Sequence, residues 1–316
     1  MPCPRNTLNK THGSKKAFLR GVEDFRNAGE AVLSVEEESL TEKKEYLIDI
    51  LRDAGAILVA YSGGADSTLL LALAHETLGP KVVAATAISE IFPARNRKGA
   101  SEFTRERGIE HVVFESEIAS LSSFLSNSPD RCYHCKKHLF QKLIQLAEER
   151  SIKHIAHGAN VDDLKDYRPG MLAATEMGII SPLVDAGLRK KEIRRLLEEM
   201  GLSQWNRPAT VCLASRIPYG SPISSKKLKM VDEAEAFLLE RGVGQCRVRH
   251  HGSVARIELS SSKLPMIMEN DLRKATLRRF REIGFVYVAV DMEGYTPGSM
   301  NRVLGIEAQR EDTDEG

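Results

Sequence analysis

Neither sign of charge is in excess in this chain, because its 45 lysines and arginines offset 44 aspartates and glutamates for a formal net charge of +1. Proteins dedicated to nucleic acids usually carry a basic excess that neutralises phosphates, so a nucleic-acid partner is not expected. No apolar run approaches the roughly 18 residues of a membrane-spanning helix. With 42% hydrophobic and 28% charged residues, the composition is ordinary for a soluble globular protein.

Cysteine is also scarce, since the 316 residues contain only five. An odd and sparse set of cysteines does not form a disulfide framework and is typical of a reducing compartment. We therefore expect a cytoplasmic protein. Two of the cysteines, Cys132 and Cys135, nevertheless form a C-x-x-C pair that requires an explanation of its own.

The two ends of the chain lack the hydrophobic patterning of folded elements. The first 20 residues contain basic residues but no acid, and they lack the apolar stretch of a secretory signal. We predict that residues 1–40 form a disordered extension, with an organellar transit peptide as the alternative. Residues 306–316 are expected to be a disordered acidic tail.

Between these ends, apolar strands alternate with helices. Buried strands are expected at 57–61, 82–88, 111–114 and 152–156, and helices at 68–78, 95–107, 136–150 and 189–200. This order predicts βαβ units and an α/β fold with a doubly wound, mostly parallel sheet over residues 41–220.

A cluster of Pro, Gly and Ser at 218–222 marks a change of pattern. Beyond it, residues 221–305 predict a smaller α+β domain for substrate binding or oligomerisation. Its expected elements are helices at 226–241 and 270–282 and strands at 245–249, 255–259 and 285–290.

A glycine loop follows the first predicted strand, with the sequence Ser62-Gly63-Gly64-Ala65-Asp66-Ser67. Two glycines allow backbone N–H groups to converge on an anion, and the next helix points its positive end at the same place. Ser62 and Ser67 add hydroxyl donors, and Asp66 either holds Mg²⁺ or caps the helix. The loop has neither the lysine of a Walker A motif nor the G-x-G-x-x-G spacing of a dinucleotide loop.

This loop resembles the signature of the PP-loop ATP pyrophosphatases. That resemblance implies an adenine-nucleotide α-hydrolase-like fold that binds ATP and Mg²⁺ and cleaves ATP between its α and β phosphates. A plain strand–turn–helix with two turn glycines is the alternative.

Three further segments narrow the resemblance. They are residues 130–136, with the C-x-x-C pair, residues 157–170, which begin His157-Gly158-Ala159-Asn160, and residues 207–220, which contain Cys212-Leu213-Ala214-Ser215-Arg216. Together with Arg247-Val248-Arg249, they resemble the LarE family of ATP-dependent sulfurtransferases over about residues 41–305.

The resemblance implies a reaction and a set of roles. ATP would activate a carboxylate of pyridinium-3,5-biscarboxylic acid mononucleotide, and sulfur would displace AMP to give the thiocarboxylate of a nickel-pincer nucleotide precursor. The implied residues fall into three groups. Those for ATP and Mg²⁺ are Ser62, Gly63, Gly64, Asp66, Ser67, Gly158, Asn160 and Asp163. Those for the substrate phosphate are Ser215, Arg216, Arg247 and Arg249, and the catalytic ones are Cys212 and Glu235.

In the single-cysteine form of the family, the sulfur comes from the protein's own cysteine, which becomes dehydroalanine. Breaking that carbon–sulfur bond requires a base for the Cα proton, and Glu235 matches the family's glutamate. A nucleophilic thiolate also needs cations that lower its pKa, and Arg216 is placed to supply one. The plainer alternatives are a buried apolar Cys212, a solvated strand face for Arg247 and Arg249, and an exposed helix acid for Glu235.

The C-x-x-C pair departs from the single-cysteine form. Cys132, Cys135 and Cys212 resemble the three-cysteine branch, in which three thiolates hold a [4Fe–4S] cluster and one iron lacks a protein thiolate. Zinc completed by His134 or His138, a redox pair without Cys212, and structural cysteines are the alternatives. Cys246 should point to the opposite face of its strand from both arginines, and neither it nor Cys3 receives a role.

Two other functions remain open from the sequence. A tRNA thiolation enzyme of the PP-loop class with an iron–sulfur cluster is the second hypothesis, although the balanced charge disfavours it. A metal-handling protein with a vestigial nucleotide site is the third. We expect a small-molecule nucleotide substrate, no membrane contact and a homo-oligomer, the last because the LarE family forms homo-oligomers.

Overall fold

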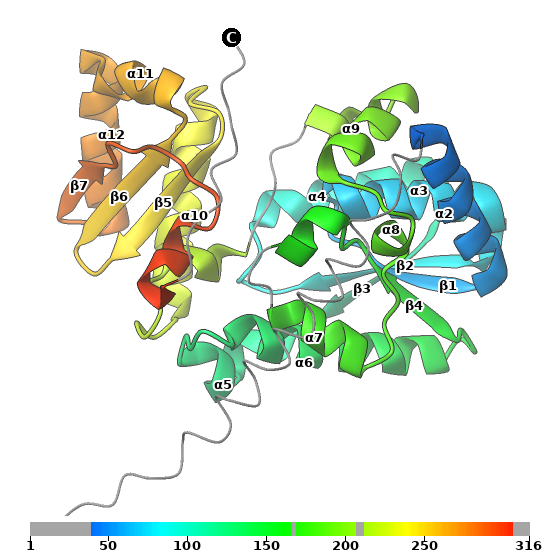
Figure 1. The fold of residues 1–316 in the computed structure, drawn as a ribbon. Helices are drawn as coiled ribbons and strands as arrows, with labels where there is room; N and C mark the ends of the chain where they lie inside the picture. Colours follow the sequence, from blue (N-terminus) through cyan, green and yellow to red (C-terminus); the bar gives the residue numbers. More distant parts are fainter. Residues whose placement is uncertain (1–38, 166–168, 207–211, 306–316) are drawn as a thin grey trace, which may run out of the picture.

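The computed structural model describes residues 39–165, 169–206 and 212–305. The predictions for residues 1–38 and 306–316, including Cys3, and for residues 207–211 of the Cys212 segment lie outside the described residues. Figure 1 shows a larger α/β part and a smaller part built on a second sheet. The α/β prediction for the first part and the separate sheet predicted for the second are both confirmed.

The larger sheet is parallel throughout, in the order β3-β2-β1-β4. Its strands are β1 (Ile57–Ala60), β2 (Val82–Ile88), β3 (Glu110–Glu115) and β4 (His154–His157). The central strand β1 reads Ile-Leu-Val-Ala and is buried, as expected for a strand covered on both faces. The carboxyl ends of β1 and β4 are therefore adjacent, which is where an open α/β sheet binds its ligands.

Helices cover both faces of this sheet (Figure 1). One face carries α2 (Leu40–Ala54), α3 (Ala65–Leu78), α4 (Ala94–Glu106), α8 (Pro182–Asp185) and α9 (Lys190–Glu199). The other carries α6 (Arg131–Glu148) and α7 (Pro169–Glu176), and the short α5 (Ser122–Leu125) packs beside α6. Helix α3 is apolar around its whole circumference because it lies in the middle of its layer, with Leu69, Leu70 and Leu73 almost fully buried.

Helix α6 begins five residues earlier than the pattern predicted, at Arg131 rather than near Lys136. No capping side chain marks the start of this helix in the sequence. The carboxylate of Asp130 bonds the hydroxyl of Ser128 and the ring of His134 instead of the helix backbone. As a consequence, both cysteines of the C-x-x-C pair lie in the first turns of a helix. The short helices α5, α7 and α8 were also absent from the prediction.

The smaller sheet has the order β5-β6-β7 and joins β5 (Cys246–His251), β6 (Val254–Leu259) and β7 (Tyr287–Val290). Strands β5 and β6 are antiparallel, and β6 and β7 are parallel. Helices α10 (Ser225–Glu240), α11 (Leu264–Met268) and α12 (Asn270–Ile283) complete this part. Its core is centred on Phe280, which packs against Phe237 and Phe285.

Helix α10 contributes to two cores at once. Leu228 and Val231 near its start pack with Ile91, Phe124 and other residues of the larger part. Ala234 and Leu238 near its end pack into the core of the smaller sheet. The predicted boundary between residues 220 and 221 therefore precedes a helix that both parts share, and the division into domains stays a prediction.

Truncation of Phe280 tests whether the second core stabilises the protein. Phe280→Ala removes a fully buried ring and should lower the free energy of unfolding by about 3–5 kcal/mol. Val286→Ala is the control, because the side chain of Val286 is 57% exposed and its loss should change stability by no more than about 0.5 kcal/mol. Urea unfolding followed by circular dichroism measures both, and equal effects would contradict the packing described.

Candidate functional site

The glycine loop connects β1 to α3 and is fixed by its two serines. The hydroxyls of Ser62 and Ser67 lie 3.0 Å apart, and the Ser67 hydroxyl donates to the Gly64 carbonyl at 3.2 Å. Gly63 has a φ of 74°, in the left-handed region that favours glycine. Gly64 is the N-cap of α3 and makes no side-chain capping bond. The first-turn N–H groups of α3 therefore present a positive helix end at this loop.

Asp66 is the second residue of α3 and is half-buried. Because Gly64 occupies the N-cap, the capping alternative for Asp66 is wrong. The carboxylate lies in the first turn beside the anion-binding backbone, which suits an ionic role there. Its assignment to Mg²⁺ stays a prediction.

The segment after β4 lies directly against the glycine loop. A Cβ atom on Gly158 would stand 2.8 Å from the backbone N of Ser67, so only glycine permits this approach. Beyond it, the η3 turn (Val161–Lys165) begins. Asn160 is fully buried, and its backbone N–H donates to Asp163 at 3.3 Å. Asp163 is also buried and lies 3.4 Å from the ammonium group of Lys190. The structure thus brings the two predicted ATP segments together.

The three cysteines of interest come from two segments. Cys132 is exposed and Cys135 is half-buried, both in the first turns of α6, whereas Cys212 is half-buried just before the η5 turn (Leu213–Arg216). Burial, and after it the charges of the neighbouring cysteines, raises the pKa values of Cys135 and Cys212. Among the described residues, no group of three His, Cys, Asp or Glu side chains is arranged around a single metal ion.

Burial raises the pKa of the Cys212 thiol, and the nearby cations only partly oppose it. Arg216 acts in the expected direction, but it does not bring the pKa below its ordinary value. The neighbouring cation with the larger effect is Arg131, a residue that received no role from the sequence.

Arg216 and Glu235 form a buried ion pair in which each side chain is 1% exposed. The Nε and Nη2 atoms of Arg216 donate to the two carboxylate oxygens at 2.8 and 3.1 Å, and the backbone N–H of Val248 donates to the same carboxylate at 3.1 Å. Burial would raise the pKa of Glu235, but Arg216 outweighs that effect and the pKa is lowered. The alternative of an exposed helix acid is therefore wrong, and the role as base stays a prediction.

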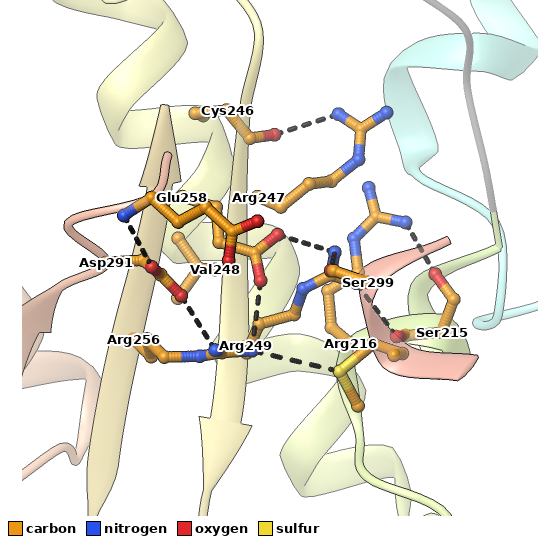
Figure 2. A network of polar contacts seen from close by, with 12 residues as sticks. Ser215, Arg216, Cys246, Arg247, Val248, Arg249, Arg256, Glu258, Asp291 and Ser299 are labelled. Atoms are coloured by element: carbon orange, nitrogen blue, oxygen red, sulfur yellow. Dashed lines mark hydrogen bonds and ion pairs between the residues drawn. The ribbon is translucent and has the colours of Figure 1, made fainter. Parts of the chain in front are cut away.

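Arg247 and Arg249 lie on the face of β5 directed towards Arg216, as Figure 2 shows. They are only 6% and 5% exposed, so the alternative of a solvated strand face is wrong. Arg249 donates to Glu258 at 2.6 Å and to the Ser215 carbonyl at 3.0 Å. The guanidinium group of Arg247 lies 5.0 Å from the ring centre of Tyr295. Cys246 points into the opposite core, as predicted.

A shared set of carboxylates extends this network. Glu258 accepts from both Arg249 and Arg256, and Arg256 also donates to Asp291 at 2.7 Å. The set comprises four guanidinium groups and three carboxylates. Its members are Arg216, Arg247, Arg249, Arg256, Glu235, Glu258 and Asp291. We refer to these seven side chains as the arginine cluster.

The three groups of residues are connected. The Ser215 hydroxyl donates to the Cys212 carbonyl at 2.8 Å, and Arg216 donates to that hydroxyl at 2.8 Å, so the turn after Cys212 touches the arginine cluster directly. Lys136, next to Cys135, adds to burial in lowering the pKa of His157 to about 3. Since His157 precedes Gly158, the cysteine helix also approaches the ATP segments.

In the described part of the chain, no helix is long and apolar enough to cross a membrane.

Comparisons with known proteins identify relatives of this chain, although no protein-family model matches it. The chain is 37% identical to an uncharacterised protein of Synechocystis sp. over 84% of its length and 99% of that protein's. It is 29% identical to an uncharacterised protein of Methanocaldococcus jannaschii over 76% of its length and 90% of that protein's. It is 34% identical to the pyridinium-3,5-bisthiocarboxylic acid mononucleotide synthase of Lactiplantibacillus plantarum, over 84% of this chain and 96% of that enzyme. At this identity and coverage, the chain belongs to the LarE family.

Proposed function

We propose that this protein is an ATP-dependent sulfurtransferase that converts a carboxylate of pyridinium-3,5-biscarboxylic acid mononucleotide into a thiocarboxylate. The observation that carries the proposal is the continuity of the site. The turn that begins at Cys212 contacts the arginine cluster through Ser215 and Arg216, and the cysteine helix approaches the strand end that touches the glycine loop.

The first chemical step is activation of the carboxylate. Its oxygen attacks the α-phosphorus of ATP, pyrophosphate leaves, and an acyl-adenylate forms. The N–H groups at the start of α3 would hold the phosphates, and Asp66 and Asp163 would hold Mg²⁺, which prefers carboxylate ligands. The second step forms a carbon–sulfur bond and releases AMP.

The substrate also carries a phosphate, and the arginine cluster is suited to it. Arg247 and Arg249 alternate with core residues on β5, so both side chains face the same buried space. Guanidinium groups bind phosphate oxygens through paired N–H donors. Ser215 and Arg216 would complete the phosphate site from the adjoining turn.

The source of sulfur is either Cys212 itself or a sulfide held at a [4Fe–4S] cluster. Cys132, Cys135 and Cys212 would hold the cluster. Cys135 and Cys212 pack against the same group of buried apolar residues, and thiolates that bind different irons of a cluster need not surround one metal ion. When bound, the cluster would offer one iron without a protein thiolate, a place for the transferable sulfide. A homo-oligomeric state and a cytoplasmic location stay predictions.

The reaction is tested directly with the purified protein, ATP, Mg²⁺ and the biscarboxylated mononucleotide under anaerobic conditions. We expect AMP and a product heavier by the replacement of one oxygen with sulfur, detected by chromatography and mass spectrometry. Intact protein mass then separates loss of the elements of H₂S at Cys212 from unchanged Cys212. AMP formation with tRNA and not with the mononucleotide would overturn the proposal in favour of tRNA thiolation.

The close contact at Gly158 yields a test of the ATP site. Gly158→Ala places a methyl group 2.8 Å from the backbone N of Ser67, which should displace the glycine loop at a cost of about 1–3 kcal/mol. We expect the dissociation constant for ATP to rise about tenfold or more while the mononucleotide still binds. Isothermal titration with each ligand measures this, and unchanged ATP affinity would show that this segment does not shape the site.

The Arg216–Glu235 pair yields a test that separates a role in the fold alone from a role in the reaction. Glu235→Gln leaves a buried Arg216 without its counter-charge and should destabilise the protein by about 3–5 kcal/mol, whereas the double variant Arg216→Met, Glu235→Leu should regain most of that stability. AMP release should remain impaired in both. A double variant with normal AMP release would show that the pair only supports the fold.

The same pair predicts a pH dependence. Because the pKa of Glu235 is lowered from its ordinary 4.5 on folding, its contribution to stability is present above pH 4.5 and is lost as the pH falls through the lowered value. The stability advantage of the wild type over Glu235→Gln should therefore shrink below about pH 4. Urea unfolding between pH 3 and pH 7 measures it.

A further inference from the structure

Arg131 is a buried cation that lacks a carboxylate partner among the described residues. Its side chain is 4% exposed, and none of the ion pairs found in the described ranges includes it. Its Nε atom is buried and has no hydrogen-bond partner there. Isolated buried charges are costly in free energy unless an opposite charge or hydrogen bonds compensate them. The position of Arg131 therefore indicates an anion that completes its surroundings.

The neighbours of Arg131 identify that anion. Arg131 directly precedes Cys132, and its Nη1 atom donates to a carbonyl two residues beyond Cys212. Its charge also acts on the sulfurs of all three cysteines. Among the described arginines, Arg216 also lies near Cys212, but its guanidinium group is engaged by Glu235. Arg131 is therefore the arginine whose positive charge can offset negative charge on the three cysteines.

Asn127 fixes the position of this cation. The Oδ1 atom of Asn127 accepts a hydrogen bond from Nη1 of Arg131, and the same Nη1 donates to the Ala214 carbonyl at 3.2 Å. Asn127 is fully buried and has a φ of 56°, a backbone conformation that asparagine tolerates better than most residues. The ring of Tyr219 lies 5.4 Å from the guanidinium carbon of Arg131 and covers one side of it.

The amide group of Asn127 also holds the segment that carries Cys212. Its Nδ2 atom donates to the carbonyls of Ile217, Pro218 and Ser221 at 3.2, 2.8 and 2.8 Å. One side chain thus binds the 217–221 turn on one side and Arg131 on the other. Through this link, the first turn of α6, with two of the cysteines, is connected to the chain that follows the third.

We propose that Arg131, held in place by Asn127, is the counter-cation and positioning residue of an anionic three-cysteine site that binds the iron–sulfur cluster. This inference rests on the cluster in the proposed function, but it concerns the protein's own charge rather than the sulfur-transfer reaction. A guanidinium group beside three thiolate ligands offsets their negative charge. Its hydrogen bonds to Asn127 and Ala214 hold both cysteine segments in register.

The test measures the cluster without the reaction. Wild type, Arg131→Met, Arg131→Lys and Asn127→Ala are reconstituted anaerobically with ferrous iron and sulfide and analysed for iron, acid-labile sulfide and reduction potential. Lys137→Met is the matched control, because it removes a positive charge from the exposed face of the same helix, where Lys137 donates to Tyr133. Thermal unfolding and circular dichroism of the apo proteins verify that each variant folds.

We expect Arg131→Met to lose iron to a chelator about 10- to 100-fold faster than wild type, the range typical of residues that support metal ligands. Its remaining cluster should have a more negative reduction potential, because adding an electron is harder without the nearby positive charge. Arg131→Lys should restore the potential but not the full retention of iron. Asn127→Ala should lose iron faster with a potential close to that of wild type, and Lys137→Met should match wild type in both.

Three outcomes would overturn the inference. They are a folded Arg131→Met with wild-type iron retention and potential, a potential that lysine does not restore, and a wild-type protein that binds no iron. If Arg131→Met does not fold, the lysine and Asn127 variants still decide the matter. If the wild type binds no iron, the AMP assay still tests the proposed function. If the AMP assay fails, the iron and potential measurements still test the role of Arg131.

Discussion

The ion pair between Arg216 and Glu235 is the constraint on which the arrangement of the site depends. Both side chains are 1% exposed, and removing two charges from water costs several kcal/mol for each ion. Two hydrogen bonds from Arg216 and one from the backbone N–H of Val248 to the Glu235 carboxylate offset that cost. These bonds form only when three elements pack in one arrangement. These elements are the turn after Cys212, helix α10 and strand β5.

This constraint links the Cys212 turn to the arginines of β5. Arg216 is four residues beyond Cys212 and donates to the Ser215 hydroxyl, which in turn donates to the Cys212 carbonyl. The opposite end of the pair touches the strand that carries Arg247 and Arg249. A buried ion pair therefore fixes the distance between the Cys212 turn and the two arginines of β5, where a flexible linker would leave it variable.

Buried charges are compensated differently on the two sides of the Cys212 turn. On the side of β5, arginines are paired with carboxylates. On the side of α6, Arg131 is buried among thiols and a neutral amide. Burial, and after it the charges of the neighbouring cysteines, raises the pKa values of Cys135 and Cys212. Binding of metal ions, which replace protons on thiols, would remove that penalty.

The sequence by itself determined the α/β class, the order of the main strands and helices, and the family, because these depend on local periodicity and on short motifs such as residues 62–67 and 212–220. It also placed Arg247 and Arg249 on one face of a strand, since strand residues alternate. Helix α6 began earlier than predicted because no capping side chain marks its start.

Only the tertiary structure decided which charged groups pair and how deeply they are buried. Arg216 looked like an activating cation for Cys212 and is instead paired with Glu235, 19 residues away. Neither Asn127 nor Arg131 received a role from the sequence, because an asparagine and an arginine near a turn are ordinary. Their importance arises from burial and from contacts to residues 83 to 94 positions further along the chain. Such partners are chosen by how segments pack, and the cost of burying a charge exists only once packing has excluded water.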